Sequence, residues 1–242
     1  MNISNLFNFG ASSAWGNASP SAKSVQELSP LTLAVQRADK RVQTEVDSNT
    51  AQLSSFGKLK SSVSEVQRTA QALTQLPATA TGTDLKTALA KLVSAFNAAT
   101  DTASTTAALP GASAASLSAS RVSKDLQTAL SGDSSLSGAL EKIGVSVQNG
   151  SLTLNDAPLD AALAADPAAV QATLTQLAGQ MNRTATTELQ ADGNVSGSLT
   201  TLSQQARVLE AQQSALQSAS QATATPGSAR GLSAYQAHMN RH

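Results

Sequence analysis

The stretch that decides the fold runs from Leu31 to Leu73 and reads LTLAVQRADKRVQTEVDSNTAQLSSFGKLKSSVSEVQRTAQAL. Its seam residues recur at intervals of three and four, about 3.5 on average, which is the repeat of a left-handed coiled coil. They are Leu31, Val35, Ala38, Val42, Val46, Asn49, Leu53, Phe56, Leu59, Val63, Val66, Ala70 and Leu73. A helix of this length would extend about 65 Å, further than the core of so small a domain. The pattern therefore predicts a long helix that packs along other long helices.

A second seam lies near the other end of the chain. It consists of Leu199, Leu202, Ala206, Leu209, Gln213 and Leu216. We expect the two seams to pack together, each with one polar interruption, Asn49 and Gln213. Asn49 is either solvated where two helices diverge, or buried where it fixes register or oligomer number. If the helices are antiparallel, Gln213 would be its hydrogen-bonding neighbour.

The composition suits narrow seams between helices better than a broad core. Apolar residues make up 40% of the chain but aromatic residues only 2%, and aromatic side chains bury the most area each. A net charge of zero, with 13% charged residues, argues against nucleic acid as a partner. With no cysteine, disulfides, thiolate metal sites and cysteine nucleophiles are excluded. No apolar run is long enough to predict membrane insertion.

The two ends of the chain differ from the middle. Residues 1–28 are rich in Asn, Ser, Gly and Ala, and we predict that they are disordered. They lack the basic region and the continuous apolar run of a secretory signal peptide, so export would need another route. Residues 223–242, which contain Pro226, Gly227 and Gly231, are predicted to form a mobile tail.

Between these ends the pattern predicts one helical stalk domain over 29–222. We expect a long helix over 29–76, helices within 84–131, helices within 157–189 and a C-terminal coiled-coil helix over 196–222. Asp84 is predicted to cap the second helix, and a loop is expected from about Ser104 to Ala115. The expected fold class is mainly α: a long-helix bundle or coiled coil with a small β-hairpin subdomain.

The hairpin is predicted over 143–154, within IGVSVQNGSLTLN. Asn149-Gly150 is the preferred pair for a two-residue type I′ turn. Such a turn places Val147 opposite Leu152 and Val145 opposite Leu154, with all four side chains on one face.

The sequence offers no catalytic, cofactor or metal site. His238 and His242 lie in the predicted tail without a carboxylate cluster, which makes metal ligation improbable. No glycine-rich phosphate loop or nucleophile elbow is present. Asp156, Asp160 and Asp166 stand where helices begin, so a capping role is favoured over paired-carboxylate catalysis. We therefore predict that the protein is not an enzyme.

Four segments together resemble the flagellar filament-cap protein family, hook-associated protein 2. The first segment contains the step Ser55-Phe56-Gly57-Lys58-Leu59-Lys60, and the third has an Ile-Gly-Val strand, an Asn-Gly turn, a Leu-x-Leu strand and an Asp-Pro helix start. The segments are residues 29–73, 92–104, 140–174 and 191–216.

The chain also differs from the family pattern. In the family a long β-rich insertion, which forms the outer domains, follows the first helix, whereas here only Thr74 to Asp84 stand in its place. The motif usual before the long helix is not recognisable in residues 1–28. The chain thus resembles a short version of the cap protein, its helical stalk without the outer domains.

The resemblance implies a structural component of the bacterial flagellum. Such a protein would be exported through the flagellar apparatus, form a ring of several copies at the filament tip and assist flagellin assembly. Its expected partners are further copies of itself, flagellin or hook–filament junction proteins, and an export apparatus or chaperone. The contacts expected to matter are those of the two seams: Val42, Val46, Asn49, Leu53, Phe56, Val63, Leu73, Leu202, Leu209, Gln213 and Leu216. Two alternatives stay open: an export partner or regulator that binds flagellar subunits through its stalk, and an unrelated coiled-coil scaffold.

Overall fold

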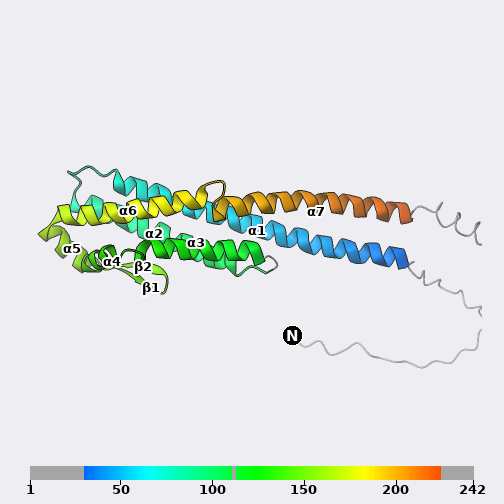
Figure 1. Cartoon of the computed structure of the whole chain (residues 1–242), viewed down its shortest axis with the longest axis horizontal. Coiled ribbons are helices and arrows are strands. Elements are labelled where there is room, and N and C mark those ends of the chain that lie inside the picture. The colour runs from blue at the N-terminus through cyan, green and yellow to red at the C-terminus, as the bar shows by residue number, and fades with distance from the viewer. Residues whose placement is uncertain (1–29, 111–112, 225–242) are drawn as a thin grey trace, which may run out of the picture.

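The computed structural model describes residues 30–110 and 113–224 as an elongated assembly of helices with one small hairpin (Figure 1). The elements in chain order are α1 (Pro30–Thr74), α2 (Gly82–Ala107), α3 (Ser113–Ser131), α4 (Ser134–Lys142), β1 (Val145–Gln148), β2 (Ser151–Leu154), α5 (Asp156–Ala165), α6 (Pro167–Leu189) and α7 (Asn194–Ala224). The predicted fold class, long helices packed together with a small β-hairpin, is confirmed.

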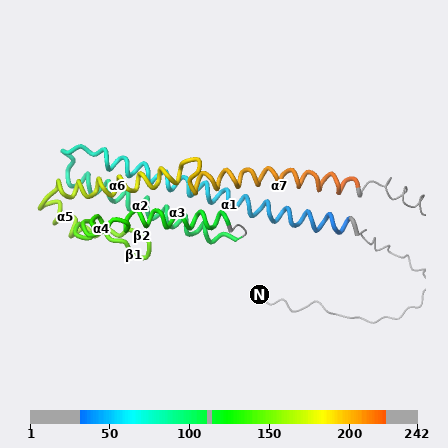
Figure 2. Tube along the Cα trace, viewed as in Figure 1, coloured from blue at the N-terminus to red at the C-terminus, as the bar shows by residue number. Residues whose placement is uncertain are grey.

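Helix α1 is the element on which the others are arranged. Along its C-terminal half it packs against α2 and α6, and along its N-terminal half it packs against α7. Helices α6 and α7 follow one another along α1, and α7 continues with α1 beyond the end of the bundle (Figure 2). We call residues 30–48 of α1 and 203–224 of α7 the helical arm, and the remaining helices with the hairpin the bundle.

The core lies in the bundle. Phe56 on α1, Phe96 on α2, Leu126 on α3 and Leu174 on α6 are all completely buried. Leucine, valine and alanine fill most of the space between them, as expected from the low aromatic content. Because α1 is surrounded by neighbours only here, its C-terminal half is the part that is fully buried.

The start of α2 differs from the prediction. Thr81, and not Asp84, is the N-cap, and Asp84 occupies the third helical position in a capping box. The Asp84 amide donates to Thr81 Oγ1 at 3.2 Å, and the Thr81 amide donates to the Asp84 carboxylate at 2.9 Å. The Thr-x-x-Asp spacing satisfies two free amide groups at once, and so moves the helix start to Gly82.

One further boundary was predicted wrongly, and one helix was not predicted. Helix α2 continues to Ala107, so the connection to α3 is shorter than the predicted loop from Ser104 to Ala115. Helix α4 was not predicted, because a nine-residue segment is too short to be stable alone and carries few apolar residues. Two features stabilise it: Asp133 accepts from the amides of Ser135 and Leu136, and Leu136 is buried against the bundle.

The hairpin has the predicted register. Val145 pairs with Leu154 and Val147 with Leu152; Asn149 and Gly150 have φ of 52° and 82°, as the type I′ turn requires. The face is not uniformly covered, since Val147 is 45% exposed while Val145 and Leu152 are buried.

The remaining bounds lie close to those expected. Helices α5 and α6 together span 156–189, and α7 begins two residues before the predicted 196. Residues 1–28 lie outside the described residues. The predicted tail over 223–242 also lies outside them, except for its first two residues, which belong to α7.

Candidate functional site

The helical arm is the part of the described chain that stands apart from the bundle. Asn49 Nδ2 donates to the main-chain carbonyl of Leu202 at 3.2 Å, and further out Gln213 Nε2 donates to Gln43 Oε1 at 2.8 Å. From the first of these contacts to the second, the residue number decreases on α1 and increases on α7, so the two helices are antiparallel. The N-terminus of α1 and the C-terminus of α7 therefore lie together at the outer end of the arm (Figure 1).

The predicted pairing of Asn49 with Gln213 is wrong. The helices are antiparallel as that prediction required, but the two residues lie at different levels of the arm. Asn49 contacts the backbone of α7, and Gln213 contacts a glutamine on α1. Of the two interpretations of Asn49, burial is observed, because its exposed fraction is 4%.

Burial changes sharply along the seam of α1. In the bundle Phe56, Leu59 and Val63 are fully buried, whereas in the arm Val42 and Val46 are only half-buried. No described side chain on α1 before Asn49 is fully buried. The reason is geometric: in the arm α1 has α7 beside it but no third helix over the seam. A two-helix pair covers only part of each apolar stripe.

On α7 the same change is visible. Leu202 and Leu209 are each 3% exposed, but Gln213 and Leu216, further along the helix, are half-buried. Val208 is 56% exposed on the flank of α7, and Leu33 on α1 is 38% exposed. The arm therefore presents apolar side chains that its own two helices do not cover.

The seam residues singled out from the sequence thus fall into two groups. Those that the protein buries within itself have no surface left to offer another chain; they are Asn49, Phe56, Val63, Leu73, Leu202 and Leu209. Those that keep accessible surface are Val42, Val46, Leu53, Gln213 and Leu216. Periodicity assigns a residue to the seam but does not tell how many helices cover it.

The hairpin lies in the bundle, away from the arm (Figure 1). Asn97 on α2 holds its inner strand: the Leu152 amide donates to Asn97 Oδ1 at 2.7 Å, and Asn97 Nδ2 donates to the Leu152 carbonyl at 2.9 Å. The side-chain amide thereby satisfies both main-chain groups on the open edge of β2. Sequence reasoning noted Asn97 only as part of the family resemblance and did not find this role.

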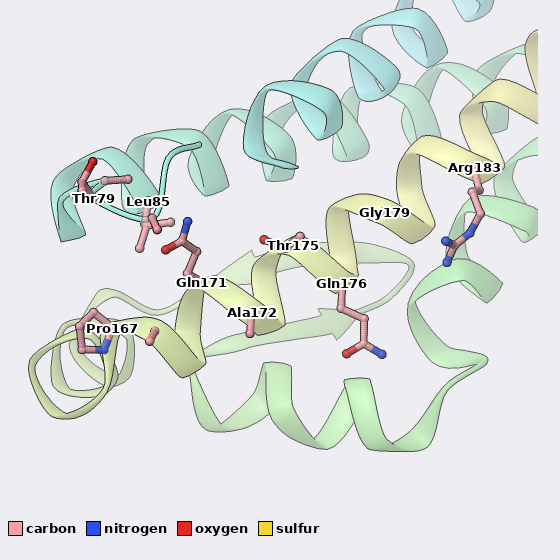
Figure 3. Close-up of a pocket in the computed structure, with 12 residues that line it drawn as sticks. Thr79, Leu85, Pro167, Gln171, Ala172, Thr175, Gln176, Gly179 and Arg183 are labelled. Atoms are coloured by element: carbon pink, nitrogen blue, oxygen red, sulfur yellow. The ribbon is translucent and has the colours of Figure 1, made fainter. Parts of the chain in front are cut away.

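A hollow of about 830 Å³ lies between the α1–α2 connection and α6. Figure 3 shows Pro167 at one end and Arg183 at the other, with Gln171 between them. The Gln171 side chain donates to the carbonyls of Leu76 and Pro77 at 3.3 and 3.1 Å, so it fixes the connection to α6. The lining holds no carboxylate, histidine or cysteine.

Within residues 30–110 and 113–224, no group of three or more His, Asp or Glu side chains is placed to hold a metal ion. The three carboxylates weighed as catalytic candidates from the sequence, Asp156, Asp160 and Asp166, form structural contacts. Lys86 Nζ lies 2.7 Å from Asp160 and 3.4 Å from Asp156, which connects α2 to α5. Asp166 accepts from the Ala169 amide at 3.0 Å and caps α6.

A sequence model of the family described as flagellar hook-associated protein 2 C-terminus matches residues 31–226. The chain belongs to the flagellar hook-associated protein 2 family. The match includes both helices of the arm and all of the bundle, so it covers most of the chain. The resemblance noted in the four sequence segments is confirmed.

The hook-associated protein 2 family is one of structural flagellar proteins, which places this chain in that class. No curated protein and no solved structure matches the chain. None of the described helices is both long enough and apolar enough to span a membrane.

Proposed function

We propose that the protein is a filament-cap-like component of the bacterial flagellum. Several copies form a ring at the filament tip and assist flagellin assembly without catalysing a reaction. The observation that carries the proposal is the helical arm, with half-covered apolar side chains along two antiparallel helices, in a chain of the hook-associated protein 2 family.

The contacts would be formed on the arm. Completing the burial of half-covered residues such as Val42 and Leu216 contributes about 1 kcal/mol each. A few such residues give a weak contact between one arm and its neighbour, which a closed ring of copies strengthens through multivalency. Charged side chains of both signs line the rest of the arm, among them Arg37, Asp39 and Glu45, and they favour one alignment of the docked helices.

The position of the chain ends supports the same assignment. The N-terminal end of α1 and the C-terminal end of α7 lie together at the outer end of the arm (Figure 1). Segments 1–29 and 225–242 therefore continue from the point where the arm would meet the filament. Flagellin or hook–filament junction proteins are the proposed partners there. The site of action is extracellular, reached through the flagellar export apparatus or with a chaperone.

The first test is the mass of the full-length protein in solution, with and without a change on the outer flank of the arm. Val208→Asp places a charge on an apolar position that α1 does not cover, while Ser214→Asp places the same charge on an exposed polar position on the opposite flank of the helix. We expect wild type and Ser214→Asp to form a closed oligomer of several copies and Val208→Asp to be monomeric with unchanged helicity.

A stable wild-type monomer, or a one-to-one complex with another flagellar subunit, would contradict the ring and support the export partner or regulator instead. The role itself is tested by deleting the gene and measuring motility and filament length. Shortened or absent filaments are expected, restored by the wild-type gene and not by Val208→Asp. Filaments of normal length after deletion would overturn the proposal.

A further inference from the structure

The helical arm carries different charges on its two sides. On α1, Asp39 and Glu45 stand before and after the seam residue Val42, each at a spacing of three. A spacing of three falls about 60° short of a full helical turn, so the two carboxylates lie on opposite sides of the seam. We call these sides flank A, which contains Arg37, Arg41, Glu45 and Val208, and flank B, which contains Asp39, Arg207 and Glu210.

Flank A is a row of charged residues on α1 with an exposed apolar residue of α7 beside it. Arg37, Arg41 and Glu45 recur at a spacing of four, so they stack on one side of the helix. Glu45 and Gln205 of α7 line the same hollow. Val208 follows Gln205 by one helical turn and is 56% exposed. Flank A therefore has two positive charges toward the outer end, and a negative charge with a valine toward the bundle.

Flank B has two hollows where α1 and α7 meet. The outer one, about 270 Å³, is lined by Val35 and Asp39 among others, and the inner one, about 360 Å³, by Ser203 and Arg207 among others. Glu210 follows Ser203 by about two helical turns, so it lies on the same side of α7. Flank B therefore has two negative charges toward the outer end and a positive charge toward the bundle.

The charges of the two flanks correspond in height along the arm. Arg207 and Glu210 lie on α7 between the points where Asn49 and Gln43 of α1 contact it, so their heights lie between those of these two residues. Each charge on flank A thus has an opposite charge on flank B within about one helical turn along the arm. The pairs are Glu45 with Arg207, Arg41 with Glu210, and Arg37 with Asp39. Among the described residues, none of these six side chains forms an ion pair within the chain.

We propose that flank A of one arm docks on flank B of a second copy of this chain. A contact between two different surfaces, repeated around an axis, closes a ring. When the arms lie along that axis all copies stand at the same height, so each charge on flank A meets its opposite on the neighbour. Val208 then enters the inner hollow of flank B. The inference rests on the proposed ring and names the two surfaces that form it.

The charges select the partner surface and its direction, while apolar contacts supply most of the affinity, because exposed ion pairs contribute little. An arm docked in the reverse direction would place Arg37 near Arg207 and Glu45 near Asp39. Like charges would then meet at both ends of the contact, which disfavours that arrangement. The charge pattern therefore fits neighbouring arms that point the same way, as a ring of identical copies requires.

The test is a charge-reversal cycle at the middle pair, measured as the mass of the full-length protein over a range of concentrations. Arg41→Glu and Glu210→Lys each place like charges in the contact, and each should raise the concentration needed for assembly by about tenfold or more. The double variant restores an opposite pair with exchanged signs, so it should assemble within about threefold of wild type. These residues are exposed, and circular dichroism should show unchanged helicity.

Lys40→Glu is the matched control. It makes the same change of charge at the residue next to Arg41, but Lys40 is exposed and lies about 200° from Val42, away from both flanks. Its assembly should equal that of wild type, and assembly impaired as much as in Arg41→Glu would mean that net charge, and not flank A, is responsible, which would overturn the inference.

The outcomes separate this interface from the ring itself. If wild type assembles and both single variants assemble equally well, the ring stands but these flanks do not form it. If both single variants are impaired and the double variant is not restored, Arg41 and Glu210 do not face each other, which also overturns the inference. A wild-type monomer would overturn the ring and the inference together.

Discussion

Asn49 and Glu188 are two buried polar side chains, and both contact the N-terminal third of α7. Asn49 reaches it from α1 by donating to the Leu202 carbonyl, and Glu188 reaches it from α6 by accepting from Asn194. Each is less than 5% exposed. A buried polar group restricts neighbours to the arrangement that satisfies it, whereas an apolar seam tolerates slippage by a whole repeat. These residues therefore define where α7 sits on its neighbours.

Replacement of Asn49 by leucine is expected to leave the stability unchanged or higher while the register of the arm becomes less defined. Leucine buries well in this seam, and removing a buried polar group is often neutral or stabilising. Because the chain has no cysteine, spin labels at Lys40→Cys and Gln217→Cys report one distance in the arm. We expect a narrow distribution in wild type and, in Asn49→Leu, a second population at longer distance, in which the helices are offset along their axes by about 10 Å, one heptad. A single unchanged distance in the variant would show that Asn49 does not fix register.

The stability of the protein should fall as pH rises from 5 to 8. Burial raises the folded-state pKa of Glu188 to about 7, above the ordinary 4.5, so its contribution is fully present below 4.5 and is lost as pH rises through 7. The difference corresponds to at most about 3 kcal/mol in the free energy of unfolding. Urea titrations at pH 5 and pH 8 measure it, and Glu188→Gln should remove the difference.

Three other carboxyl groups affect stability in the opposite direction and at lower pH. Hydrogen bonds from Arg68 to Glu65, from Thr81 to Asp84 and from Ser135 to Asp133 lower the pKa of each carboxyl. Their stabilisation is lost only as pH falls through those lowered values. A rise in the free energy of unfolding between pH 5 and 8 would therefore contradict the raised pKa of Glu188.

At the scale of the element, α1 is one continuous helix in two environments. Its periodicity is the same from Val35 to Leu73, yet its seam is fully buried from Phe56 onward and half-buried in the arm. The helix can span both because its hydrogen bonds are internal to it and need no partner. Tertiary contacts therefore set its stability locally, position by position.

Two matched alanine substitutions measure the difference in packing between the two parts of α1. Phe56→Ala removes a fully buried aromatic ring and should lower the free energy of unfolding by about 3–5 kcal/mol. Val42→Ala, on the same seam but half-buried, should lower it by less than about 1 kcal/mol in the monomer. Denaturant titration of both variants gives the two values, and equal losses would mean that the arm is as well packed as the bundle.

The hairpin also depends on a local contact, the pair of hydrogen bonds between Asn97 and Leu152. Asn97→Leu leaves the amide and carbonyl of Leu152 without partners, which should cost about 1–3 kcal/mol. Asn97→Asp keeps the acceptor for the Leu152 amide but replaces the donor, so it should retain the protection of that amide in hydrogen exchange. Retained protection in both variants alike would indicate that the hairpin is held by burial of Leu152 and not by this pair of hydrogen bonds.

At the scale of the whole molecule, one core supports an arm that extends from it. The bundle holds nearly all of the fully buried side chains, while the arm relies on a single helix–helix contact, with polar links at Gln213 and, where the arm meets the bundle, at Asn49. Regions with few buried contacts open locally at a lower free energy than the core. The molecule therefore combines a stable body with a less stable extension.

Hydrogen exchange should reflect this arrangement. In the monomer, amides of residues 34–47 are expected to exchange at least a hundredfold faster than those of 56–73, although both belong to α1. Ring formation should slow exchange in the arm and leave the core unchanged. Slow exchange throughout α1 in the monomer would contradict the two-environment description, and no change in the arm on oligomerisation would place the ring contacts elsewhere.

Several elements could be predicted from the sequence because short-range chemistry specifies them. The heptad spacing predicted α1 and α7, Asn149-Gly150 predicted the turn and its register, and Asp166-Pro167 predicted the start of α6. Where prediction failed, a longer-range contact decided the outcome. Helix α4 forms because the bundle covers Leu136 and Leu140, a contact that no local pattern reveals.

The candidate sites show the same division. The seam of Leu31–Leu73 and its partner near the C-terminus were determined by the sequence itself, since side-chain periodicity follows from helix geometry alone. Only the tertiary structure decided which part of that seam is covered by both α2 and α6 and which by α7 alone, and hence that Val42 keeps exposed surface while Phe56 does not. It also buried Glu188 in the last turn of α6, where its carboxyl accepts from Asn194 at the start of α7. Burial and electrostatic coupling depend on neighbours that lie far apart in the chain, and the spacing of residues carries no record of them.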